Sequence, residues 1–223
     1  MALTVDDIYQ FTLNLIKKNQ AGPIGSVVWA RHWNNQQAAY MDDLLGRFQR
    51  MSNGKAGTNT GLIENETISQ KLAPFTKKAT IVVAAGDGNK PSGFIYKLGL
   101  RVNGADVRII RHNQIATVNN NVIDAPSVTT NTYYAVSYEG YYTFLPNTVT
   151  ESILDYIVAP TDVFWNYSVV SSRQVYNSVG SSQPQWDNNS CREITQRVLN
   201  TLGVSFKDGD FASFGNRVVN TGN

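Results

Sequence analysis

The chain has 223 residues, of which 42% are hydrophobic, 11% aromatic and 16% charged, and its formal net charge at pH 7 is +2. This apolar content and small net charge exclude intrinsic disorder, and the charged fraction, well below the usual quarter, indicates a surface built from amides and hydroxyls. No apolar run approaches the length of about 18 residues that a membrane helix needs, and Cys191 is the only cysteine, so we expect neither a membrane span nor an internal disulfide.

Residues 1–74 have the apolar periodicity of helices. Thr4 and Asp7 have the spacing of a capping box, and apolar side chains then recur every three or four residues as far as Ile16. The same spacing predicts two further helices, with a polar loop rich in Gly, Asn and Thr between them. These elements are a second helix over 26–48, the loop at 52–61 and a short helix over 63–72.

Residues 75–170 change to the pattern of β-strands. The glycine-rich segment 86–93 separates two such runs, and we interpret it as the loop of a hairpin. Asn103-Gly104 is a strong signal for a two-residue turn between antiparallel strands, and Glu139-Gly140 marks a second turn. The predicted strands are 79–85, 94–102, 105–111, 132–138, 141–145 and 149–159, with a short continuation at 163–167 and an irregular segment at 119–131.

Residues 171–223 begin with a polar loop and return to helical periodicity. Asp187 is the expected N-cap of a C-terminal helix, and Gly203 is expected to end that helix at the C′ position. A further short helix is expected over 208–219.

The order of these elements predicts the fold class. Helices, then strands, then helices are typical of an α+β protein, here with an antiparallel β-sheet or sandwich core, N-terminal helices and a C-terminal helix. We expect the segments 1–74, 75–170 and 171–223 to form one compact unit.

Candidate catalytic groups are few, and none stands in a motif of defined geometry. Lys90 lies within the glycine-rich segment, but the residue order of a phosphate-binding loop is absent. Cys191 lies near the start of the C-terminal helix without a paired base, so an inert packed thiol is the favoured interpretation. The remaining candidates are His32 and His112 and the carboxylate pairs Asp42/Asp43, Glu64/Glu66 and Asp208/Asp210. We predict no enzymatic activity, no metal and no cofactor.

Five tyrosines in two adjacent predicted strands are the most unusual feature: Tyr133, Tyr134, Tyr138, Tyr141 and Tyr142. The favoured interpretation is cross-strand packing in the core. The alternatives are an interface with a neighbouring subunit, where aromatic residues are enriched, or a platform for a carbohydrate.

Three stretches of the sequence resemble a known class of proteins. They are residues 11–22 (FTLNLIKKNQAG), 147–165 (NTVTESILDYIVAPTDVFW) and 186–204 (WDNNSCREITQRVLNTLGV). They are similar to virion structural proteins of tailed phages infecting Bacteroides, in particular the head–tail connector, or ring, proteins of crAss-like podoviruses. These stretches are structural patterns, so the resemblance supplies no active-site residues.

The resemblance implies a virion protein of the neck or tail, assembled in the host cytoplasm without contact with a membrane. It implies a homo-oligomeric ring, of about 12 copies if it follows the portal's symmetry. Its partners would be the portal protein and other connector and tail proteins, and double-stranded DNA would pass through it without specific binding.

Specific residues are expected to carry these contacts. The candidates for subunit contacts are Trp29, Trp33, Tyr40, Tyr133, Tyr134, Tyr138, Tyr141 and Tyr142. The candidates for facing the DNA path are Arg47, Arg50 and Lys55. The alternative functions are a tail- or capsid-borne carbohydrate-binding module and, less favoured, a glycan-cleaving enzyme whose paired carboxylates would face a cleft.

Overall fold

The structure is a computed structural model that describes residues 3–18, 24–53, 59–121 and 123–205. Lys55, the expected helix over 208–219 and the pair Asp208/Asp210 lie outside these ranges. The chain forms two compact units: the helical unit, residues 1–74 with 160–223, and the barrel unit, residues 75–159. The middle segment expected from the sequence ran to residue 170, whereas the barrel unit ends at Ala159.

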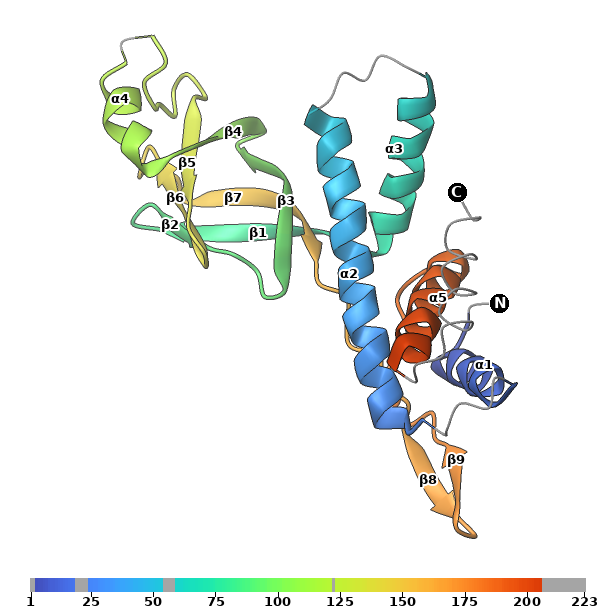
Figure 1. Ribbon diagram of the computed structural model, residues 1–223. Coiled ribbons are helices and arrows are strands. Elements are labelled where there is room, and N and C mark those ends of the chain that lie inside the picture. The colour runs from blue at the N-terminus through green and yellow to red at the C-terminus, as the bar shows by residue number, and fades with distance from the viewer. Residues whose placement is uncertain (1–2, 19–23, 54–58, 122, 206–223) are drawn as a thin grey trace. The chain divides into compact units, whose positions relative to one another are not determined.

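Four long helices and one two-stranded sheet make up the described part of the helical unit (Figure 1). They are α1 (Val5–Lys18), α2 (Ser26–Asn53), α3 (Asn59–Leu72), α5 (Asn188–Ser205), β8 (Tyr167–Val170) and β9 (Arg173–Tyr176). The predicted capping box is confirmed, because Thr4 N donates to the Asp7 carboxylate at 3.0 Å and Asp7 N donates to Thr4 Oγ1 at 3.1 Å. Asp187 also caps α5 as predicted, through Asn189 N at 3.0 Å.

The core of the helical unit is largely aromatic. Trp29 and Trp33 of α2 are fully buried, and the ring of Tyr9 lies 5.1 Å from that of Trp29 and 4.6 Å from that of Trp165. Aromatic pairs at such distances contribute about 0.5–1.5 kcal/mol beyond the burial of their area. Aromatic side chains therefore pack α1 and α2 onto the segment that follows the barrel unit.

Side-chain amides hold this segment, residues 160–166, against α2. Asn34 accepts a hydrogen bond from Val163 N at 2.8 Å and donates one to Val163 O at 3.1 Å, as a neighbouring β-strand would. Gln37 donates to Thr161 O at 3.1 Å. Because buried backbone groups need partners, these amides pair with the backbone of Val163 and Thr161 as a strand would.

The barrel unit is a closed sheet whose strands follow the order β1-β2-β6-β5-β4-β3-β7 (Figure 1). Its strands are β1 (Thr76–Ala84), β2 (Asp87–Asn89), β3 (Phe94–Val102), β4 (Ala105–Ile110), β5 (Tyr133–Ser137), β6 (Tyr141–Leu145) and β7 (Glu151–Val158). All neighbouring strands are antiparallel except β4 and β5, which are parallel. The crossover between these two contains a 3₁₀ turn (His112–Gln114) and the short helix α4 (Ile115–Asn119). The α+β class with a mainly antiparallel core is confirmed, and the sheet is closed.

The expectation of a hairpin around residues 86–93 is wrong. β1 turns at Ala85 and Gly86, whose φ angles are 52° and 92°, into β2, which then pairs with β6. β1 and β3 do not pair, because both flank β7. Gly86 allows the turn, and Gly88 allows β2 to pack closely against β1, because a Cβ on Gly88 would lie 2.6 Å from Ile81 Cγ2.

Other element ends also differ from the sequence-based expectation. The Asn103-Gly104 turn is confirmed, with φ angles of 51° and 83° between antiparallel strands. The predicted loop at 52–61 is too long, because α2 runs to Asn53 and α3 starts at Asn59. Helix α5 does not end at Gly203, because this residue is buried and the helix continues to Ser205. No described helix combines the length and hydrophobicity needed to cross a membrane.

Candidate functional site

Most of the aromatic residues proposed for subunit contacts are packed inside their own unit. Six of the eight have exposed fractions between 0% and 5%: Trp29, Trp33, Tyr40, Tyr133, Tyr134 and Tyr142. Only Tyr138 and Tyr141 retain a substantial surface, and their rings stack on each other with centroids 4.8 Å apart. The buried six present no surface to a partner, and a carbohydrate platform would be limited to this stacked pair.

Tyr40 lies at the centre of a polar cluster that joins three helices. Its hydroxyl accepts a hydrogen bond from Lys71 Nζ at 2.9 Å, and Lys71 also binds the Glu193 carboxylate at 2.8 Å. Burial and the nearby Glu193 raise the pKa of Tyr40. Burial alone lowers the pKa of Lys71, but Glu193 and Tyr40 outweigh it, and the pKa is raised. Each group has a partner from a neighbouring helix, so the cluster stabilises the fold.

The acidic and basic candidates on α2 lie on the surface. Asp43 pairs with Arg197 of α5 at 2.8 Å, so this carboxylate is engaged in a structural ion pair. Arg47 and Arg50 are both exposed, and Arg50 Nε donates to Gly46 O at 3.1 Å. Their exposure is compatible with a surface facing DNA.

Lys90 has partners within the barrel unit. Its ammonium donates to Ser137 Oγ at 3.0 Å and to the Tyr138 carbonyl, and it lies 4.7 Å from the centre of the Tyr142 ring. Burial lowers the pKa of Lys90. These contacts tie the glycine-rich segment to the turn between β5 and β6 and leave the lysine poorly placed to bind a phosphate.

The single thiol and the two histidines were the candidates for nucleophilic catalysis. Cys191 is 1% exposed, and burial, with a smaller effect of the Asp187 charge, raises the pKa of its thiol to about 12. His32 and His112 belong to different units, and His112 Nδ1 lies 2.8 Å from the hydroxyl of Tyr138. Among the described residues, no group of three His, Cys, Asp or Glu side chains could hold a metal.

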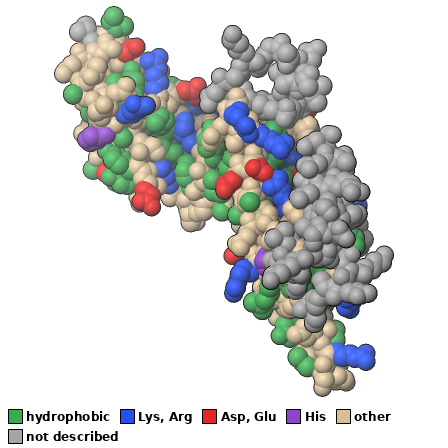
Figure 2. Space-filling model, viewed as in Figure 1, with side chains coloured by type: hydrophobic (Ala, Val, Ile, Leu, Met, Phe, Trp, Pro, Cys, Tyr) green, Lys and Arg blue, Asp and Glu red, His purple; other side chains and the backbone are tan. Residues whose placement is uncertain are grey.

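A hairpin of the helical unit presents the clearest candidate for a binding surface. We call residues 167–176, which comprise β8, β9 and the turn between them, the arm. Its valines are largely exposed, with fractions of 67% for Val169, 55% for Val170 and 46% for Val175. Figure 1 shows the arm extending beyond the helices of its unit, and Figure 2 shows hydrophobic (green) surface along it, with tan atoms and a basic (blue) side chain.

Aromatic stacking anchors one face of the arm. Tyr167 and Tyr176 pair across the hairpin, and the ring of Trp165 stacks on both, at 5.6 Å and 6.0 Å. The indole of Trp165 in turn donates to the Asp6 carboxylate at 2.9 Å. The opposite face, which we call the outer face of the arm, carries Ser168, Val170, Arg173 and Val175. A hairpin of two short strands is marginally stable by itself, so these anchors at its base hold it in place.

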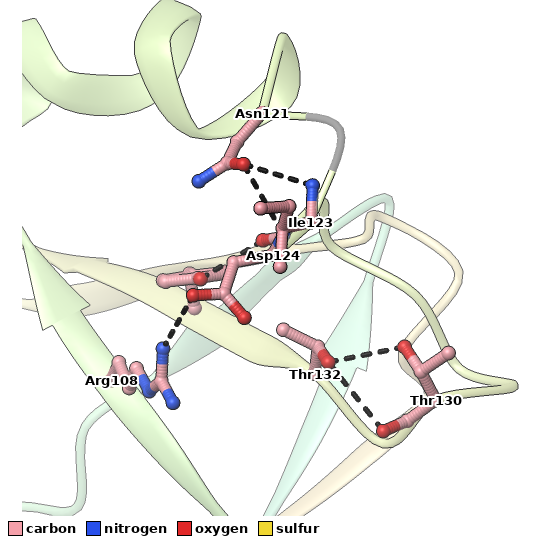
Figure 3. Close-up of polar contacts among 7 residues, drawn as sticks. Arg108, Asn121, Ile123, Asp124, Thr130 and Thr132 are labelled. Carbon is pink, nitrogen blue, oxygen red and sulfur yellow. Dashed lines mark hydrogen bonds and ion pairs between the residues drawn. The ribbon is translucent and has the colours of Figure 1, made fainter.

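The barrel unit has a second candidate surface in the connection between α4 and β5. We call residues 120–121 and 123–132 the pinned loop, and Figure 3 shows its polar contacts. Asn121 Oδ1 accepts hydrogen bonds from the backbone of Ile123 at 3.0 Å and of Asp124 at 3.3 Å. Arg108 pairs with the Asp124 carboxylate at 3.5 Å, and the Tyr134 hydroxyl donates to the Asp124 carbonyl at 2.9 Å. These bonds fix the loop while the Ile123 side chain remains 91% exposed.

Comparison with known proteins adds no family to this description. No family model matches the sequence, and no curated protein is significantly similar to it.

The residues of both candidate surfaces were not singled out from the sequence. The arm had a usable signal, because two β-rich tetrapeptides, YSVV and RQVY, flank Ser171-Ser172. That signal was weak, because the φ angles of 50° and 63° at these serines are those that Gly or Asn usually adopts. No sequence signal indicated that Ile123 would be exposed, because a single isoleucine in an Asn-rich segment is not distinctive.

Proposed function

We propose that the chain is a non-enzymatic structural subunit of a virion, which assembles into a homo-oligomeric ring in the connector between the portal and the tail. The observation that carries the proposal is the arm. Its valines are exposed because little in their own unit covers them. Exposed apolar surface of this kind marks sites of protein–protein contact. The resemblance of three sequence stretches to connector proteins favours a ring over other assemblies.

The chemistry of the described residues supports a structural role. The thiol is buried, Asp43 and Glu193 have basic partners, and Lys90 binds carbonyl and hydroxyl oxygens. The pinned loop adds a second apolar contact point, since its bonds preorganise the exposed Ile123 and reduce the entropy lost on binding. A connector subunit needs such a second surface because it binds components above and below its ring as well as its own copies.

The oligomeric state tests the proposal. We expect the purified chain, alone or mixed with portal assemblies, to sediment as a closed oligomer and to appear as rings by electron microscopy. A protein that stays monomeric in both conditions would contradict the proposal.

Matched variants connect the assembly to the arm. Replacing Val170 and Val175 by Asp should abolish the assembly, because burying an unpaired carboxylate at an interface is costly. The control is Ser171→Asp, which adds a charge at the turn of the arm without removing a valine, and which should assemble as the original chain does.

A further inference from the structure

The helical unit also exposes an apolar side chain on α1. This helix turns Val5, Ile8 and Ile16 into the core, whereas Phe11 is 54% exposed on its outer side. Asp7 lies one turn before Phe11 and is exposed, so the two share a face of the helix. This surface thus places an aromatic ring beside a carboxylate. One oxygen of that carboxylate, Asp7 Oδ2, also accepts the capping hydrogen bonds from Thr4 N at 3.0 Å and Thr4 Oγ1 at 2.7 Å.

The outer face of the arm is complementary to this patch. It presents the exposed Val170 and Val175, and Arg173 supplies the only charge in the whole segment 163–186. The arm thus offers apolar side chains beside one cation, and α1 offers an apolar ring beside one anion. The two surfaces are complementary in both hydrophobicity and charge. The arm and the α1 patch are different surfaces of one unit, as a head-to-tail contact requires.

We propose that the outer face of the arm packs on α1 of a neighbouring copy, with Val170 and Val175 against Phe11 and Arg173 directed toward Asp7. The inference rests on the proposed function, because it names the surfaces through which the ring closes. Each copy then donates its arm on one side and accepts an arm on the other. Repetition of this heterologous contact closes a ring when the rotation between copies allows it.

Cysteine cross-linking tests this pairing in the full chain. A double variant, Phe11→Cys with Val170→Cys, should form a ladder of disulfide-linked dimers, trimers and larger species under mild oxidation. A disulfide requires Cα atoms about 4.4–6.8 Å apart, so the bond reports close contact between the two sites. The native Cys191 is buried and its thiol pKa is raised to about 12, so it remains outside the reaction.

The matched control moves the second cysteine to the other face of the arm. Val169 is at least as exposed as Val170 but lies on the other face of the arm, so Phe11→Cys with Val169→Cys should cross-link more slowly than Phe11→Cys with Val170→Cys. Each single variant should form no ladder, and mixing the two single variants should give heterodimers.

The outcomes separate the inference from the proposed function. Equal cross-linking of both double variants would overturn the arm-to-α1 contact. Disulfide-linked dimers of the single variant Val170→Cys would also overturn it, in favour of a symmetric arm-to-arm contact. Assembly by sedimentation without any ladder would also overturn it and leave the ring in place. Failure of the original chain to assemble at all would overturn the ring and the inference together.

Discussion

The barrel and the arm are both β-structures, and they treat their strand edges in opposite ways. The barrel closes its sheet so that each strand has a neighbour on both sides, and it buries Phe144 and Leu154 completely. The arm has two strands, two open edges and valines on both faces. A closed sheet is complete in one chain, whereas a two-stranded ribbon with exposed valines gains stability from whatever covers it. The comparison separates a sheet that is complete within one chain from a ribbon that leaves its apolar side chains exposed.

The largest expected effect lies in the barrel core. Phe144→Ala removes a ring that is 0% exposed and packs near Tyr142, with ring centroids 6.2 Å apart. The cavity left behind should lower the free energy of unfolding by about 3–5 kcal/mol, measured by urea denaturation. A loss below 1 kcal/mol would mean that the closed sheet does not hold a packed core.

The segment that leads to the arm should show the next largest effect. Asn34→Ala removes two hydrogen bonds to Val163 and leaves its buried backbone groups unpaired, at a cost of about 1–3 kcal/mol. Thermal unfolding of the helical unit measures the loss. Asn35→Ala, one residue along the helix and exposed, is the matched control and should unfold like the original chain. Equal effects of the two substitutions would show that the amide pairing with Val163 is dispensable.

A smaller, pH-dependent effect is expected at the start of α1. Hydrogen bonds from the Thr4 side chain and backbone lower the pKa of Asp7 in the folded chain. A lowered folded-state pKa stabilises the fold above the unfolded value near 3.8, and this contribution is lost as the pH falls through the folded-state pKa. The stability difference between the original chain and Asp7→Asn should therefore shrink below about pH 4, as followed by circular dichroism. A difference that is constant with pH would contradict the role of the charge.

The smallest effect should come from the arm itself. Val169→Ala shortens a side chain that is 67% exposed, so the unfolding free energy of the monomer should change by less than about 0.5 kcal/mol. Dilute samples, in which copies are separate, provide this measurement. A loss comparable to that of Phe144→Ala would show that the arm is part of a folded core and would remove the contrast with the barrel.

Local signals in the sequence predicted local structure well. The spacing of Thr4 and Asp7, the Asn103-Gly104 turn and the cap at Asp187 each depend on a few adjacent residues, and all three are present. The neighbours of β7 were not predictable in this way. They depend on pairings such as Thr76 with Ile157, which are 81 residues apart, and no short motif encodes them.

The candidate surfaces were harder to predict than the fold. Tyrosines suit cores and interfaces equally, so sequence alone could not separate the buried Tyr133 from the half-exposed Tyr138. Valines in a strand predict burial, and those of the arm are exposed because their unit offers little to cover them. An apolar or aromatic side chain favours burial, but only the three-dimensional structure shows whether its own chain buries it.

The pairing of β1 with β7 has a consequence for how such a chain can change. The first and last strands of the barrel lie side by side, with Thr76 opposite Ile157, so the polypeptide enters and leaves this body at neighbouring points. A short linker could join these points. The barrel unit could therefore be deleted or replaced by another domain without a change in the path of the chain through the helices before and after it.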